Sequence, residues 1–201
     1  MFKLQYLNLA LNQINAEIPK FIGKFSNLVS LGLSHNKMRR TMPINLVKLS
    51  FLETLLLNKN QLDSGNVINM PFHIALTNFS HLKYLWLHNN KLSGLFPLAI
   101  GRLSTNLSIL GLSNNKIQGN IPPHIGNLSS LTFLNLSENF LNGNVPLLGK
   151  LVKIERLYLS NNNLEGNILT ILKDYTTLVS CILVKIISLE RFKIPFHTLN
   201  N

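Results

Sequence analysis

Residues 131–146 read LTFLNLSENFLNGNVP, a leucine-rich segment that passes through Asn139 and ends at Pro146. Its first part follows the template L-x-x-L-x-L-x-x-N-x-L. The alternation in L-x-L predicts a short strand with one buried face. The template fits the chain seven times, beginning at Leu4, Leu28, Leu52, Leu82, Leu107, Leu131 and Ile154. Seven fits of the same fixed positions indicate a repeat architecture.

The repeats begin 24, 24, 30, 25, 24 and 23 residues apart. A unit of this length cannot bury its own apolar side, so consecutive units must stack on one shared core. The predicted fold class is therefore an α/β solenoid. We expect a right-handed superhelix with a parallel β-sheet on its concave face and short 3-10 or loop segments on its convex face.

One asparagine in each repeat stands where the predicted strand ends. Its amide has both donors and an acceptor, so it can pair with backbone groups of adjacent turns that would otherwise be buried without partners. We expect a structural ladder formed by Asn12, Asn36, Asn60, Asn90, Asn115, Asn139 and Asn162.

The composition argues against an enzyme. The 201 residues include 42 Leu and 28 Asn, but only two Asp and one Cys. A single cysteine excludes a disulfide scaffold and a cysteine-cluster metal site. The six histidines show no spacing typical of metal ligands. We expect no catalytic residue, no metal and no cofactor.

The second half of the unit is also patterned, as in IQGNIP at residues 117–122 and LNGNVP at residues 141–146. The whole unit resembles the plant-specific leucine-rich repeat, L-x-x-L-x-L-x-x-N-x-L-x-G-x-I-P, over about residues 4–178. The long third repeat and the later STNL segment at residues 104–107 are similar to the ectodomains of plant leucine-rich-repeat receptor-like serine/threonine kinases. The immune-receptor subgroup shows this order.

The resemblance implies non-catalytic recognition of a peptide or protein ligand, with a co-receptor as a further partner, in defence or developmental signalling. It also implies a location at the extracellular face of the plasma membrane or in the apoplast. Two alternatives stay open. One is a soluble repeat protein similar to polygalacturonase inhibitors, and the other is a truncated, non-functional or decoy receptor fragment.

The chain also departs from complete receptors of this kind. Residues 4–11 read as a strand and not as a signal peptide, because Gln5 and Asn8 interrupt the apolar run. No run of 18 apolar residues predicts a membrane span. The kinase motifs G-x-G-x-x-G, His-Arg-Asp and Asp-Phe-Gly do not occur in the sequence. We therefore expect an ectodomain fragment, a truncated gene product or a partial gene, without the kinase.

The predicted domain organisation has two parts. Residues 1–178 form the seven-repeat solenoid, whose long third repeat carries an insertion at residues 63–75. Residues 179–201 form a degenerate C-terminal repeat or cap, because Ile186 occupies the place of the ladder asparagine and the apolar residues take helical spacing. A helical cap, a decayed repeat and a segment not selected to fold remain open.

Positions that flank the strand leucines should face solvent on the concave side. The fourth repeat places three ring side chains there, including the only tryptophan, and exposed aromatic residues are typical of protein-binding hot spots. An apolar surface should continue across Gly111. The candidate ligand-binding residues are Tyr84, Trp86, His88, Leu56, Phe133, Arg156 and Tyr158. The alternative is that these rings merely cover one another on the sheet.

Two further features have functional and inert interpretations. The insertion at residues 63–75 is a second candidate for binding, or an irregular but inert part of the repeat. Four N-x-[ST] sequons predict N-glycosylation at Asn78, Asn106, Asn127 and Asn135. Their number is what chance predicts for this composition, so it does not indicate secretion. Asn135 is the weakest candidate because a glycan there would obstruct the concave face.

The net charge of +11, from 19 basic and 8 acidic residues, raises the question of nucleic-acid binding. The positions of the charges argue against it, because Arg156 is the only basic residue among the predicted concave positions. We expect a dispersed basic surface and no nucleic-acid partner.

Overall fold

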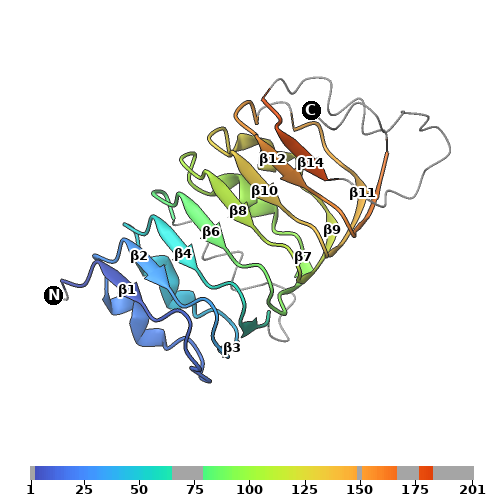
Figure 1. Ribbon diagram of the computed structural model, residues 1–201. Helices are drawn as coiled ribbons and strands as arrows, with labels where there is room; N and C mark the ends of the chain where they lie inside the picture. The colour runs from blue at the N-terminus through green and yellow to red at the C-terminus, as the bar shows by residue number, and fades with distance from the viewer. Residues whose placement is uncertain (1–2, 65–78, 149–150, 167–176, 183–201) are drawn as a thin grey trace.

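The computed structural model describes residues 3–64, 79–148, 151–166 and 177–182. Within them, short parallel strands stack along one axis (Figure 1) and form an eight-stranded sheet in the order β1-β2-β4-β6-β8-β10-β12-β14. The predicted solenoid is therefore confirmed. Its strands are β1 (Tyr6–Asn8), β2 (Ser30–Gly32), β4 (Thr54–Leu56), β6 (Tyr84–Trp86), β8 (Ile109–Gly111), β10 (Phe133–Asn135), β12 (Arg156–Tyr158) and β14 (Ser180–Ile182).

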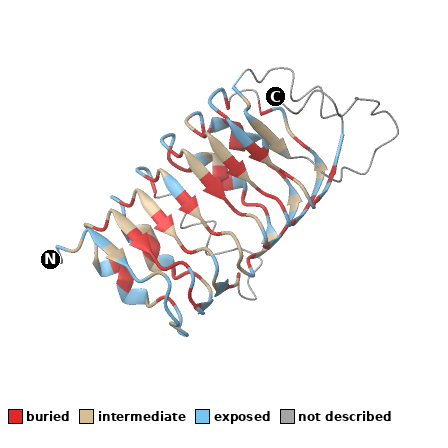
Figure 2. Cartoon of the chain, viewed as in Figure 1, coloured by how far each residue is buried: buried red, intermediate tan, exposed pale blue. Residues whose placement is uncertain are grey.

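The central leucines of the strands from β2 to β12 build the core. Leu31, Leu55, Leu85, Leu110 and Leu134 are at most 2% exposed, and the parallel register places each beside the next. The buried residues form one continuous cluster along the solenoid (Figure 2). No repeat has a core of its own, as expected for a unit of this length.

A second layer of strands follows the ladder asparagines, and the sequence interpretation did not foresee it. After β2, β4, β6, β8, β10 and β12 the chain turns and stays extended, so its backbone groups pair with those of an adjacent repeat. Four of these strands form one sheet in the order β13-β11-β9-β7, and β3 pairs with β5. They are β3 (Arg39–Arg40), β5 (Gln61–Leu62), β7 (Ser93–Leu95), β9 (Lys116–Asn120), β11 (Phe140–Asn144) and β13 (Asn163–Glu165).

Short 3-10 helices cover the convex side. They are η1 (Lys20–Lys24), η2 (Ile44–Lys48), η4 (Leu98–Arg102) and η5 (Pro123–Asn127). Each begins after a proline in extended conformation, which sets the direction of the turn. A Cβ atom at Gly23 of η1 would lie only 2.5 Å from the carbonyl oxygen of Asn45. Glycine is therefore required where neighbouring helices touch.

The ladder asparagines tie adjacent repeats together. Asn115 donates through Nδ2 to the carbonyl oxygens of Leu87 (3.1 Å) and Leu112 (3.0 Å) and accepts at Oδ1 from the Leu92 N–H (3.0 Å). Leu112 is in its own repeat, whereas Leu87 and Leu92 belong to the preceding one. The same three bonds recur at Asn36, Asn60, Asn90, Asn139 and Asn162.

Asn12 differs because the structure gives it partners only within its own repeat. It is exposed and donates to the carbonyl oxygens of Leu9 and Ala10. The backbone groups at this end of the ladder are open to solvent, so loss of the Asn12 side chain should cost less stability than loss of a buried ladder asparagine.

The residue before each ladder asparagine has a left-handed backbone. The φ angles at these seven positions lie between 50° and 58°, a region that costs energy for residues with a Cβ but is tolerated by Asn. The residues are Leu11, His35, Lys59, Asn89, Asn114, Glu138 and Asn161. This tight turn brings the asparagine back under the strand that precedes it.

The predicted boundary at residue 178 precedes the last described strand. Residues 180–182 form β14, in which Cys181 pairs in register with Leu157, so a helical cap does not begin here. The rest of the predicted terminal segment, residues 183–201, lies outside the described residues. Of the insertion, Asp63 forms a bridge with Lys91, and residues 65–75 also lie outside the described part.

We predict that replacing Asn115 by Leu lowers the free energy of unfolding by about 3 kcal/mol or more, because three buried backbone groups lose their partner at about 1–3 kcal/mol each. Urea denaturation of both proteins measures the difference. The matched control is Asn12→Leu, for which we expect a loss below about 1 kcal/mol because solvent replaces the lost bonds. Equal losses at the two positions would contradict the structural role of the ladder.

Candidate functional site

Four rings from three repeats meet on the concave face of the large sheet. Trp86 of β6 packs against Phe133 of β10, with ring centroids 5.2 Å apart, and Phe133 packs against Tyr158 of β12 at 5.5 Å. The ring of His88 meets Trp86 edge-on at 5.3 Å. These four residues form what we call the aromatic cluster.

Gly111 of β8 makes the cluster continuous. It lies between Trp86 and Phe133 in the sheet, because β8 pairs with both β6 and β10. A Cβ atom at this position would overlap the six-membered ring of Trp86. The indole therefore lies over the glycine backbone and reaches a ring two strands away. The expected apolar surface continues across Gly111 because this glycine has no side chain to separate the rings of Trp86 and Phe133.

The remaining candidate residues lie around the cluster. Leu56 of β4 is in register with Trp86, and Arg156 of β12 is in register with Phe133. Arg156 is exposed and Leu56 half-buried. Tyr84, at the start of β6, is 40% exposed. The sheet therefore brings the seven predicted residues onto one face, with the rings at its centre.

The rings of Trp86, Phe133 and Tyr158 are half-buried. They cover part of one another, as the inert interpretation expects, and they also leave apolar surface open to solvent. Strands hold these side chains in place, so a ligand would not have to order them on binding. The arrangement suits an apolar or aromatic side chain of a ligand, because offset ring contacts favour such groups.

His88 links the rings to a group of basic residues. Burial is the main factor that lowers the pKa of His88 below the ordinary 6.5, and the charges of Lys59 and His35 lower it further. The amide nitrogen of Asn89 lies 2.7 Å from Nδ1 of His88 and donates to it when the ring is neutral. These contacts favour the uncharged ring in the free protein.

His35, Lys59 and His88, which we call the basic cluster, come from three consecutive repeats. The Lys59 N–H donates to the His88 carbonyl oxygen at 2.9 Å, so these two repeats are in direct contact. His35 and Lys59 were not predicted, because only the positions that flank the strand leucines were considered as concave-facing. Both residues stand immediately before a ladder asparagine, and this shared position in the repeat could have indicated that they lie at the same edge of the sheet.

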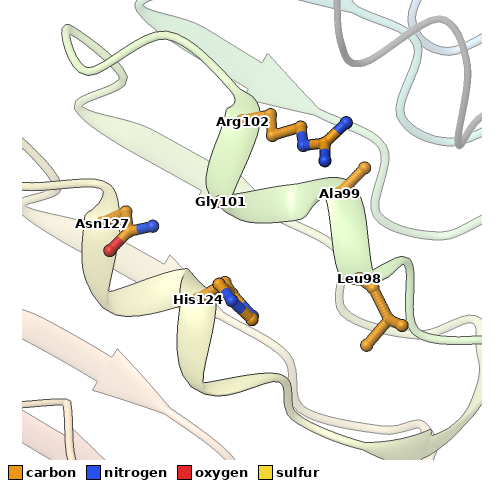
Figure 3. Close-up of a pocket in the computed structure, with 6 residues that line it drawn as sticks. All are labelled: Leu98, Ala99, Gly101, Arg102, His124 and Asn127. Carbon is orange, nitrogen blue, oxygen red and sulfur yellow. The ribbon is translucent and has the colours of Figure 1, made fainter.

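A hollow of about 400 Å³ lies on the convex side between η4 and η5 (Figure 3). It is lined by Leu98, Ala99, Gly101, Arg102, His124 and Asn127.

Asn127, a predicted glycosylation site, is exposed here, and Asn106 is also exposed. Asn135 is half-buried and accepts the Ser137 N–H at Oδ1 (3.0 Å). Asn78 lies outside the described residues, and glycosylation stays a prediction at all four sites.

Other kinds of site find little support in the described part of the chain. There, no group of three His, Cys, Asp or Glu residues is arranged to hold a metal ion. Burial raises the pKa of the Cys181 thiol to about 11, which makes it a weak nucleophile at neutral pH. The helices of the described residues are all too short or too polar to cross a membrane.

Comparison with known proteins agrees with the fold and the repeat pattern. The Leucine Rich Repeat family matches residues 3–25, 81–103, 106–128 and 153–174. These four segments are leucine-rich repeats. It is 37% identical over 176 residues to Receptor-like protein 18 of Arabidopsis thaliana, an alignment that covers 88% of this chain and 20% of that protein.

Solved structures of plant receptors resemble this chain. The ectodomain of the Arabidopsis receptor kinase HAESA, in complex with an IDA peptide hormone, matches with a TM-score of 0.82 and 31% identity over 90% of this chain and 30% of that one. The plant peptide hormone receptor RGFR1, in complex with RGF2, matches with a TM-score of 0.76 and 31% identity over 90% and 32%. The chain thus spans at most about a third of these relatives.

We predict that protonation of His88 destabilises the fold. The unfolded chain takes up this proton near pH 6.5, whereas the folded chain resists it, so the free energy of unfolding should fall as the pH drops below 6.5. Urea denaturation at pH 7.5 and 5.5 measures the loss. His88→Gln should lose less stability over the same interval, because every other titrating group is shared; an identical loss would contradict the lowered pKa.

Proposed function

We propose that this chain is the ligand-sensing part of a plant cell-surface receptor and that it binds a peptide or protein ligand on its concave face. The observation that carries the proposal is the aromatic cluster, a solvent-facing group of rings assembled from three repeats on rigid strands. Interfaces concentrate their binding energy in such side chains. The same face offers no arrangement suited to bond cleavage or group transfer among its described residues.

The structural relatives support a peptide as the ligand. The solved structure of HAESA contains an IDA peptide hormone ligand. The structure of the plant peptide hormone receptor RGFR1 contains RGF2. A further structure of HAESA contains both IDA and the co-receptor SERK1, and it matches this chain with a TM-score of 0.81 and 29% identity. By analogy, the complete receptor would act in defence or development at the extracellular face of the plasma membrane, with a co-receptor and a serine/threonine kinase.

We predict that Trp86→Ala weakens peptide binding at least tenfold, because the indole forms the centre of the cluster and such truncations remove about 1.4 kcal/mol or more at a hot spot. Selection of a displayed library of random 12-residue peptides on the wild-type chain supplies the probes. Affinities of the selected peptides for the variant are then measured by fluorescence anisotropy.

The matched control is Phe51→Ala, which removes a ring that lies outside the concave sheet, between η2 and β4, and is 54% exposed. It should leave the affinities unchanged, and thermal melts should show that both variants fold. Unchanged affinity in Trp86→Ala would overturn the proposal. Selection of no peptide, together with binding to an intact secreted enzyme, would favour the inhibitor-like alternative instead.

A further inference from the structure

The basic cluster lies at one edge of the concave face. His35 and Lys59 occupy the left-handed position before the ladder asparagine in two neighbouring repeats, and both side chains are exposed. His88 belongs to the next repeat and senses the charges of both. Of the three, Lys59 carries the positive charge, and His35 and His88 lie on the repeats on either side of it, so this edge offers positive potential to a ligand that lies along the solenoid.

This concentration of charge is local. From the fourth repeat on, the left-handed position before the ladder asparagine holds Asn89, Asn114, Glu138 and Asn161. The residues at this position are therefore basic in the second and third repeats and neutral or acidic in the later ones. At the opposite end of the strands, Lys83 is paired with Glu53 at 2.9 Å. The basic cluster is therefore a specific feature of the second to fourth repeats, and not simply a sample of the overall charge of +11.

The basic cluster and the aromatic cluster share one residue. The ring of His88 contacts Trp86 and lies near enough to Lys59 and His35 to be influenced by their charges. A ligand that occupies the aromatic cluster therefore extends directly to the basic cluster. Positive charge beside an apolar surface is complementary to a peptide that carries both an apolar and an acidic side chain.

We infer that the basic cluster selects an acidic side chain, aspartate or glutamate, in the peptide whose apolar residue occupies the aromatic cluster. This inference rests on the proposed function. Lys59 of the basic cluster follows β4, and Gly111 at the centre of the aromatic cluster is on β8, two strands away. Two strand spacings amount to about 10 Å, which an extended peptide covers in about three residues.

The only tryptophan of the chain lies in the aromatic cluster, so its emission reports binding there directly. The probes are acetylated and amidated peptides of the form Glu-(Ser/Gly)n-Phe with n of zero, two and six, each with a twin in which Gln replaces Glu. Blocked ends leave the glutamate side chain as the only carboxylate.

At low salt we expect the Glu peptide with a two-residue spacer to bind about two- to fivefold more tightly than its Gln twin, as one partly exposed charge pair with Lys59 would produce. The preference should disappear at about 0.5 M NaCl, because salt screens exposed charges. Lys59→Asn should remove it too. Asparagine stands at the equivalent left-handed position in later repeats, so this variant should fold, and its circular dichroism and thermal melt check that it does.

The matched control is Lys24→Asn, which removes the same charge from η1 on the convex side and should leave the preference intact. Equal affinity of the Glu and Gln peptides, or an equal effect of the two lysine variants, would overturn the inference. If both peptides bind equally and saturate the Trp86 signal, the proposed peptide-binding face stands and only the acidic preference fails. If neither changes the emission, both fail.

Discussion

The rest of this structure depends on how the backbone N–H and C=O groups find hydrogen-bond partners where each strand ends. A solenoid must turn its chain inward beneath every strand, and the turn would bury carbonyl and amide groups without partners. One asparagine in each repeat, such as Asn115, bonds two carbonyl groups and one N–H across two repeats. Only a side chain with donors and an acceptor of this size can do so. The repeat length, the left-handed turn before the asparagine and the second layer of strands after it all accommodate this arrangement.

The same constraint shapes the concave face. Because the ladder and the parallel register hold successive repeats in step, side chains far apart in sequence become neighbours. Trp86 and Phe133 are 47 residues apart in the sequence, yet their ring centroids are 5.2 Å apart. The scaffold residues are equivalent in every repeat, so they cannot distinguish ligands. Under the proposed function, selectivity would come from the positions where repeats differ, which here are the rings, Gly111 and the basic residues of the second to fourth repeats.

Much of the fold was predictable from residues 131–146 and their counterparts, because burial of alternate leucines needs only local periodicity. The second layer of strands was not predictable in the same way. Its members β9 and β11 contain Gln118, Asn120, Asn142 and Asn144, polar residues with no apolar alternation to mark a strand. They are extended because the neighbouring repeat supplies backbone partners. The strand β14 likewise forms beside β12, although the residues around it have helical spacing.

The candidate site divides in the same manner. The sequence by itself determined which side chains flank the strand leucines, and therefore that Tyr84, Trp86 and Phe133 share a face, since alternation along a strand is a local property. Only the tertiary structure decided that Trp86 lies over Gly111 to reach Phe133, and that His35 and Lys59 approach His88. Those contacts depend on the register between repeats and on the left-handed turns, which arise only when neighbouring repeats pack together.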